Sequence, residues 1–311
     1  MQIRAFLTLR TIVLPVLLAI SMFTLLERKI FRFMQARRGP VMVRKGGILQ
    51  PIADGIKLLT KEAIYPSSSK TIPFYLAPVF SLSLALAIWL WTPISYSNTH
   101  IYSSINLIII FVVSSLVSYL ILAAGWASSS TWSLLGSIRA TSQMISYEVS
   151  LRLICLTPVL IGTSLSLSQL WSYQLIIWNL FAMWRSWALF FTSILAESNR
   201  TPFDLVERES ELVSRYNVEY SRLLFTFFFL TEYSFILIMC IITVSLFFRR
   251  ESYVLLVSIK VLAFIVLFIW VRATYPRFRF DHLILLLWKV YLPLAIVWVT
   301  LTIVFITHGL L

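Results

Sequence analysis

Acidic residues concentrate in one stretch of this chain, between Ala196 and Ser221. The stretch reads AESNRTPFDLVERESELVSRYNVEYS and holds six of the 13 aspartates and glutamates: Glu197, Asp204, Glu207, Glu209, Glu211 and Glu219. Carboxylates that lie close together can bind and release protons in turn, because each changes the proton affinity of the next. A solvated acidic loop is the alternative. Apolar residues interleave the stretch and further carboxylates lie in the apolar segments on both sides, which favours a proton path.

Two of those further carboxylates are Glu148 and Glu232, each inside a long apolar segment. A charge at the centre of a membrane costs about 2.5–3.5 kcal/mol on insertion scales, so such a group normally faces a partner, a polar interior or water. Arg152 follows Glu148 by four residues, a spacing that allows an ion pair. The pair is either a self-neutralising bridge or part of a proton-handling site. Glu232 has no acid–base partner within a helical turn, so it must find one on another helix or be protonated.

The apolar runs that carry these groups recur along the whole chain. Of the 311 residues 59% are hydrophobic and 13% charged, and the mean hydropathy is +0.87; soluble domains carry about 25% charged residues. The runs are long enough to cross a bilayer and do not alternate as barrel strands do. We therefore expect an all-α polytopic membrane protein with one transmembrane domain (residues 1–311) and eight spans, near residues 5–26, 72–91, 101–124, 134–156, 175–195, 218–248, 253–271 and 283–306.

One segment after the first span is periodic but does not span. In GILQPIADGIKLLTKE, Ile48, Ile52, Ile56 and Leu59 repeat at helical spacing on one face, and charged residues occupy another. This pattern predicts an amphipathic helix at the membrane interface. An ordinary half-buried helix would show the same pattern.

The net charge of +13 is explained by the distribution of lysines and arginines between the two sides of the membrane. With eight spans both termini lie on one side, which holds only Arg4, Arg10, Arg249 and Arg250. The loops on the opposite side hold most of the other lysines and arginines, the asymmetry of the positive-inside rule. We therefore expect no nucleic-acid partner.

Several kinds of cofactor site lack their sequence signature. The two cysteines, Cys155 and Cys240, form no CxxC, and the three histidines are scattered. Neither a dinucleotide-binding GxGxxG nor a phosphate-binding GxxxxGK[ST] is found. We therefore expect no metal, iron–sulfur cluster or nucleotide to be bound by this chain.

Five blocks of sequence carry a resemblance to a known family. In order they are LLERKIFRFMQARRGP, GILQPIADGIKLLTKE, SQMISYEVSL, AESNRTPFDLVE with ESELVS and YNVEYS, and RATYPRFRFD. From about Leu26 to Lys289 the chain resembles the chain 1 family of the proton-pumping NADH:ubiquinone oxidoreductases, respiratory complex I. The resemblance implies a subunit between membrane arm and peripheral arm that frames the ubiquinone tunnel and begins an acidic proton path.

The resemblance also assigns roles by matching position. Ubiquinone would be the substrate, with electrons supplied by a partner; the partners would be the quinone-reducing subunits of the peripheral arm, adjacent membrane-arm subunits and lipid. Residues implied at the quinone are Glu27, Arg28, Arg37, Asp54 and Lys57. Residues implied in the proton path are Glu148, Glu197, Asp204, Glu207, Glu209, Glu211, Glu219 and Glu232, with Arg200, Arg272, Arg277 and Arg279 balancing charge.

Four arginines depart from the family pattern. Arg208 and Arg215 stand where the family usually has glycine, so the backbone of the acidic stretch is expected to differ locally. Arg152 and Arg185 lie in spans that the family keeps apolar. Each can pair with a neighbouring carboxylate and lower its pKa.

Two other functions share some of these features. A related subunit of an ion-pumping membrane-bound hydrogenase uses the same scaffold without quinone. A free-standing secondary transporter would be expected to show inverted repeats and broken mid-membrane helices, and neither is apparent. The short termini favour the mitochondrial inner membrane as the location, with a bacterial plasma membrane as the alternative.

Overall fold

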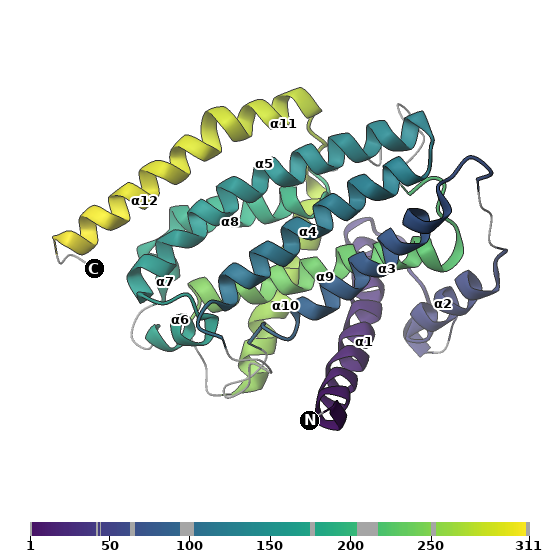
Figure 1. Cartoon of the computed structure of the whole chain (residues 1–311). Helices are drawn as coiled ribbons and strands as arrows, with labels where there is room; N and C mark the ends of the chain where they lie inside the picture. Colours follow the sequence, from purple (N-terminus) through teal and green to yellow (C-terminus); the bar gives the residue numbers. More distant parts are fainter. Residues whose placement is uncertain are drawn as a thin grey trace.

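Helices form the regular structure of the chain and pack along one another (Figure 1). The computed structural model describes residues 2–41, 43, 45–62, 66–93, 103–174, 178–203, 217–249 and 253–308, and no β-strand occurs within these ranges. The helices are α1 (Gln2–Met34), η1 (Lys45–Gly47), α2 (Gln50–Thr60), α3 (Thr71–Ile88), α4 (Asn106–Ala127), α5 (Thr131–Gly162), α6 (Leu167–Tyr173), α7 (Asn179–Ala182), α8 (Trp184–Glu197), α9 (Arg222–Phe247), α10 (Val254–Thr274), α11 (Phe280–Leu286), the π-helical turn η2 (Leu287–Tyr291) and α12 (Leu292–Thr307).

Six helical runs of the described chain are long and apolar enough to cross a membrane. They are α3, α4, α5, α9, α10 and the continuous run from α11 to α12. Each coincides with a predicted span, and the first predicted span lies within α1. The prediction of an all-α polytopic membrane protein is confirmed, while the number of eight spans stays a prediction.

The fifth predicted span differs most from its expectation. It is divided between α7 and α8, because the backbone leaves the helical region at Met183 (φ −128°, ψ 39°). The 14 residues of α8 extend about 21 Å, less than the roughly 30 Å of the hydrocarbon core. Polar side chains before the break bind another helix: Gln174 Nε2 and Asn179 Nδ2 donate to Leu246 O at 2.8 and 3.2 Å.

The predicted amphipathic helix is present as α2. It lies to one side of the main group of helices (Figure 1) and contacts α1 and α9. None of its residues is buried; Ile52 and Ile56 are 55% and 56% exposed. An apolar helical face that stays uncovered is what an interfacial helix offers to lipid.

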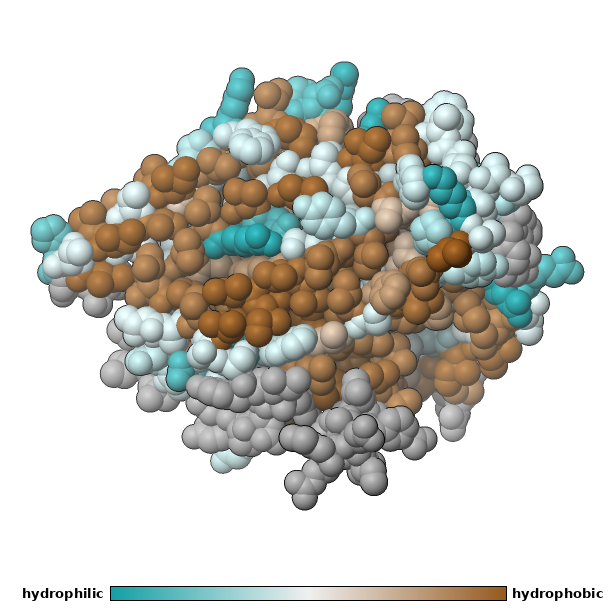
Figure 2. Space-filling model, viewed as in Figure 1, coloured by the Kyte–Doolittle hydropathy of each residue, from teal (hydrophilic) through white to brown (hydrophobic). Residues whose placement is uncertain are grey.

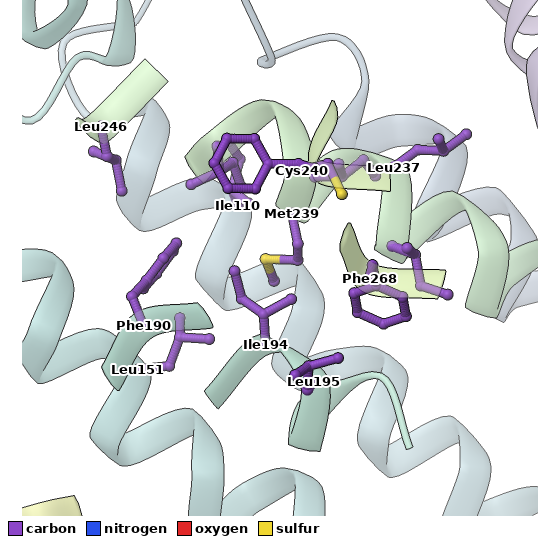
Figure 3. Close-up of a cluster of buried hydrophobic side chains, with 14 of the residues drawn as sticks. Ile110, Leu151, Phe190, Ile194, Leu195, Leu237, Met239, Cys240, Leu246 and Phe268 are labelled. Atoms are coloured by element: carbon purple, nitrogen blue, oxygen red, sulfur yellow. The ribbon is translucent and has the colours of Figure 1, made fainter. Parts of the chain in front are cut away.

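The core lies where α5, α8 and α9 meet. Figure 3 shows Leu151 of α5, Phe190 and Ile194 of α8 and Met239 of α9 pointing toward one another, with Phe268 of α10 beside them; all five are buried. In a membrane, close packing rather than exclusion of water holds such helices together. This packing holds α8 beside α9 and so positions Glu197, at the end of α8, and Arg222, at the start of α9.

The outer surface is largely apolar. Figure 2 shows hydrophobic residues across the face formed by α3, α4 and α5, and residues such as Leu255 and Trp270 of α10 are more than half exposed. Apolar surface on this scale is covered by lipid or by other proteins.

Candidate functional site

A cavity of about 520 Å³ lies between α1, α2 and α9. Its volume is within the range of small-molecule sites, roughly 300–1,000 Å³. Most of the lining is apolar, including Ile20, Leu58, Phe229 and Leu230, while charged residues lie along one part of the wall: Glu27, Arg28 and Asp54. An apolar cavity with a few polar groups can hold an amphipathic molecule in a defined orientation.

Glu27 is the buried carboxylate of this cavity, 6% exposed. Arg272 of α10 forms an ion pair with it, and the Tyr233 hydroxyl of α9 donates to its Oε2 at 2.8 Å. A buried carboxylate is stabilised only when paired and hydrogen-bonded. The contacts therefore join α1, α9 and α10 at one point.

Asp54 attaches α2 to the same cavity. Its Oδ2 accepts from Arg28 of α1 at 2.7 Å, and its Oδ1 accepts from Gln50 one turn earlier on α2 at 3.0 Å. Two ion pairs therefore meet at the C-terminal part of α1. Glu27 binds Arg272, and its neighbour Arg28 binds Asp54.

Arg200 lies behind Tyr233 and is almost fully buried, at 1% exposure. Its Nη2 forms an ion pair with Glu232 Oε2 at 3.1 Å, and its guanidinium carbon lies 4.6 Å from the Tyr233 ring centroid. The face of an aromatic ring attracts a guanidinium. Tyr233 therefore stands between two ion pairs, binding Glu27 through its hydroxyl and Arg200 through its ring.

A second cavity, of about 40 Å³, lies on the other side of Glu232. Glu197, Asn199, Thr231 and Ser114 contribute polar groups to its wall. Glu197 Oε2 and Asn199 Oδ1 are shielded from solvent and have no hydrogen-bond partner within the described chain. A space of this size can hold a water molecule where polar groups line it, and buried polar groups such as these two oxygens are usually satisfied by water.

Glu148 approaches the same region from α5. It pairs with Arg152, as its spacing predicted, and interacts with the Ser114 side chain and, electrostatically, with Glu197. Arg152 also donates to Phe111 O of α4 at 3.0 Å. Glu197 of α8 and Glu232 of α9 therefore line the small cavity, and Glu148 of α5 lies next to it through its interactions with Ser114 and Glu197.

Glu232 was expected either to find a partner on another helix or to be protonated; it pairs with Arg200, which follows the end of α8. Other predicted residues lie apart: Arg37 and Lys57 are exposed and do not line the large cavity, and Arg279 pairs with Asp281 at the surface. Arg277 is also exposed. Asp204, Glu207, Glu209 and Glu211, with Arg208 and Arg215, lie outside the described residues.

Glu219 precedes α9 instead of lying on it, because the helix begins at Arg222. It is half-buried beside Tyr220, whose hydroxyl donates to Ala124 O at 3.3 Å. Burial raises the pKa of the Tyr220 hydroxyl.

The sequence did not indicate two residues of the site, Tyr233 and Gln143. Tyr233 is the neighbour of Glu232, but nothing in the sequence shows that it faces Glu27. Gln143 of α5 donates to Ala196 O and Phe203 O at 2.9 and 3.0 Å and so fixes the segment that carries Glu197 and Arg200. A glutamine inside an apolar span is itself a signal, because a polar group there needs a partner.

No group of three or more metal-binding side chains occurs among the residues that the structure describes. The polar side chains of both cavities are carboxylates, hydroxyls, a phenol, a guanidinium group and an amide. These can bind and exchange protons and can bind a carbonyl or hydroxyl group of a ligand.

Comparison with known proteins shows the family to which this chain is similar. The family model described as NADH dehydrogenase matches residues 7–303. NADH-ubiquinone oxidoreductase chain 1 of Balaenoptera physalus is 46% identical over 293 residues, covering 92% of this chain and 92% of the relative. The chains of the same name from Patiria pectinifera (44% over 292 residues, 91% and 89%) and Mammuthus primigenius (46% over 293 residues, 92% and 92%) are similar to the same extent.

Proposed function

The chain belongs to the NADH dehydrogenase family, and from that membership we propose that it is the membrane subunit of an NADH–ubiquinone oxidoreductase, respiratory complex I, that binds ubiquinone and begins a proton path. The mitochondrial inner membrane is its proposed location. Peripheral-arm and membrane-arm subunits and lipid are its proposed partners.

One observation carries the proposal. The large cavity at Glu27 and the small cavity at Glu197 are connected through a continuous series of contacts: Glu27 to the Tyr233 hydroxyl, the Tyr233 ring to Arg200, and Arg200 to Glu232. A change of charge at one end of such a series alters the electrostatic environment at the other, because interactions in a low-dielectric interior are weakly screened.

The cavities suit the two halves of the proposed reaction. Ubiquinone has an apolar tail and a polar ring, and the large cavity has apolar walls with Glu27, Arg28 and Asp54 in one part. Reduction of the quinone to the quinol takes up two electrons, supplied by a partner subunit, and two protons. Glu197 and Glu232 in the wall of the small cavity, and Glu148 next to them, are groups that can take up and pass on protons. Asp204, Glu207, Glu209, Glu211 and Glu219 would extend the path.

Substitution of Glu197 tests this function in the assembled complex. Glu197→Gln keeps the shape of the side chain but removes the titratable group. We therefore expect quinone reductase activity and proton pumping to fall by about a hundredfold or more, the scale of general acid–base contributions. Asp204→Asn is expected to act in the same direction. The reaction of NADH with an artificial acceptor should be retained, because it does not use this subunit.

Glu62→Gln is the matched control, since it removes a carboxylate that is exposed and lies outside both cavities. Its activities should equal those of the native complex. Normal quinone turnover and pumping in both Glu197→Gln and Asp204→Asn would refute the proton path.

A further inference from the structure

Helix α2 forms one wall of the large cavity, although none of its residues is buried. Pro51, Asp54, Gly55, Leu58 and Leu59 all line the cavity, over the full length of the helix. Although α2 contacts α1 and α9, packing holds it less firmly than the walls that contain buried residues, so side-chain attachments contribute more to its position.

Within the described chain, two side-chain attachments join α2 to other helices. Arg28 of α1 binds Asp54 near the middle of α2. At its C-terminal end, Arg222 donates from both Nε and Nη2 to Leu59 O, at 3.0 and 2.9 Å. The two attachments connect α2 to the two helices that form the opposite walls.

The Arg222 contact is well matched to its acceptor. Leu59 is in the last turn of α2, where carbonyl groups have no partner within the helix. The C-terminal end of a helix also carries partial negative charge, which favours a cation there. A guanidinium that offers two donors to one such oxygen holds it more firmly than a single donor would.

The backbone of Arg222 points to the same role. Its φ is +59°, a left-handed conformation that residues other than glycine rarely adopt. Such a conformation persists where the surrounding structure holds it, often at functional positions. Arg222 is the first residue of α9, and the next residue, Leu223, lines the large cavity together with Leu59.

We propose that Arg222 is a positioning residue that holds α2 against the start of α9. It thereby sets the shape of the cavity in which ubiquinone is bound. It acts through α2 and does not touch the substrate. The identity of the substrate rests on the proposed function, whereas the attachment of α2 does not.

The test compares Arg222→Gly with Arg222→Ala in the assembled complex. Both remove the two hydrogen bonds, but only glycine adopts the positive φ without strain. Lys61→Gln is the control, because it removes an exposed cation next to the end of α2 without removing either attachment. The measurements are hydrogen exchange of the α2 amides, the kinetics of quinone reduction, and the reaction of NADH with an artificial acceptor.

We expect both Arg222 variants to exchange the α2 amides at least about tenfold faster and to raise the KM for quinone about threefold to tenfold with kcat retained. Arg222→Lys, which keeps one charged donor, should fall between them and the native complex. Lys61→Gln should match the native complex in every measurement.

Two results would overturn the proposal. Native exchange rates in both Arg222→Gly and Arg222→Ala would show that Arg222 does not hold α2. Faster exchange with an unchanged KM would show that the position of α2 does not govern substrate binding. The native complex is assayed first with quinone. If it does not reduce quinone, the proposed function is refuted, and the hydrogen-exchange measurement alone then tests whether Arg222 holds α2.

Discussion

Tyr233 shows how much one side chain contributes at the scale of the residue. Its hydroxyl is a hydrogen-bond donor to Glu27, and its ring is a face for the Arg200 guanidinium. The two interactions use different parts of the side chain, so substitution can remove one and leave the other.

Tyr233→Phe keeps the ring and removes the hydroxyl. Glu27 then loses a hydrogen-bond donor in a buried position, which costs about 1–3 kcal/mol of interaction free energy. Because Glu27 lines the large cavity, we expect kcat/KM for quinone to decrease by about tenfold. Tyr253→Phe, at a tyrosine that is 71% exposed, is the control and should have no effect. An unchanged kcat/KM in Tyr233→Phe would mean that Arg272 alone satisfies Glu27.

Arg200 and Glu232 form a buried ion pair, so the stability of each depends on the other. Removing one partner of a buried ion pair leaves an uncompensated charge and costs about 3–5 kcal/mol, whereas replacing both by apolar residues is often close to neutral. We therefore expect Arg200→Met to reduce the amount of assembled complex on native gels much more than the Arg200→Met, Glu232→Met double variant does.

The double variant should also assemble without pumping protons, since Glu232 is gone from the small cavity. Equal losses of assembled complex in the single and double variants would show that Arg200 is needed for contacts other than this pair.

At the scale of the helix, close approach of α4 and α5 decides where Ser114 and Glu148 lie. Gly125 of α4 has no side chain at the point where α5 passes, and a Cβ there would overlap the Oγ and Cβ of Ser137. Small residues permit such approaches between membrane helices. The two helices could not keep this separation with a larger residue at position 125.

Gly125→Ala tests that packing. The overlap should destabilise the protein by about 1–3 kcal/mol, measured as a lower unfolding temperature of the purified complex, and Ser137→Gly in the same chain should restore it. Gly55→Ala is the matched comparison, because a Cβ at Gly55 meets nothing within 4 Å and alanine favours α2 as a helix. A lower unfolding temperature for Gly55→Ala alone would contradict this account.

At the scale of the whole molecule, the distribution of charge and the direction of the helices define two sides. With the predicted eight spans, we expect the basic segments after α1 and after α10 to lie on one side, and the segment before α10 and the end of α12 to lie on the other. The buried native cysteines, Cys155 and Cys240, leave the surface open to labelling of introduced thiols.

Single cysteines at Arg38 and Tyr275 should therefore react with a membrane-impermeant thiol reagent from one side of the membrane. Cysteines at Tyr253 and His308 should react only from the opposite side. All four positions are exposed. Labelling of Tyr253→Cys and Tyr275→Cys from the same side would mean that α10 does not cross the membrane, and the predicted topology would be wrong.

The sequence by itself determined what depends on neighbouring residues and on composition. Apolar runs predicted the long helices, helical periodicity predicted α2, and a spacing of four predicted the Glu148–Arg152 pair, because each is a property of a local segment. The isolation of Glu232 also showed that it needs a partner from elsewhere. The break between α7 and α8 was not predicted, and the hydrogen bonds from Gln174 and Asn179 to the end of α9 could not be found from the local sequence.

Only the tertiary structure decided which distant groups meet. Glu27 is separated by 206 residues from Tyr233 and by 245 from Arg272, and no local pattern links them. The two cavities likewise exist because α1, α2 and α9, and α4, α5, α8 and α9, enclose them in space. The carboxylates between Ala196 and Ser221 were visible from composition, but the contacts of Glu197 and Glu232 depend on helix packing, which brings together groups that the chain itself keeps apart.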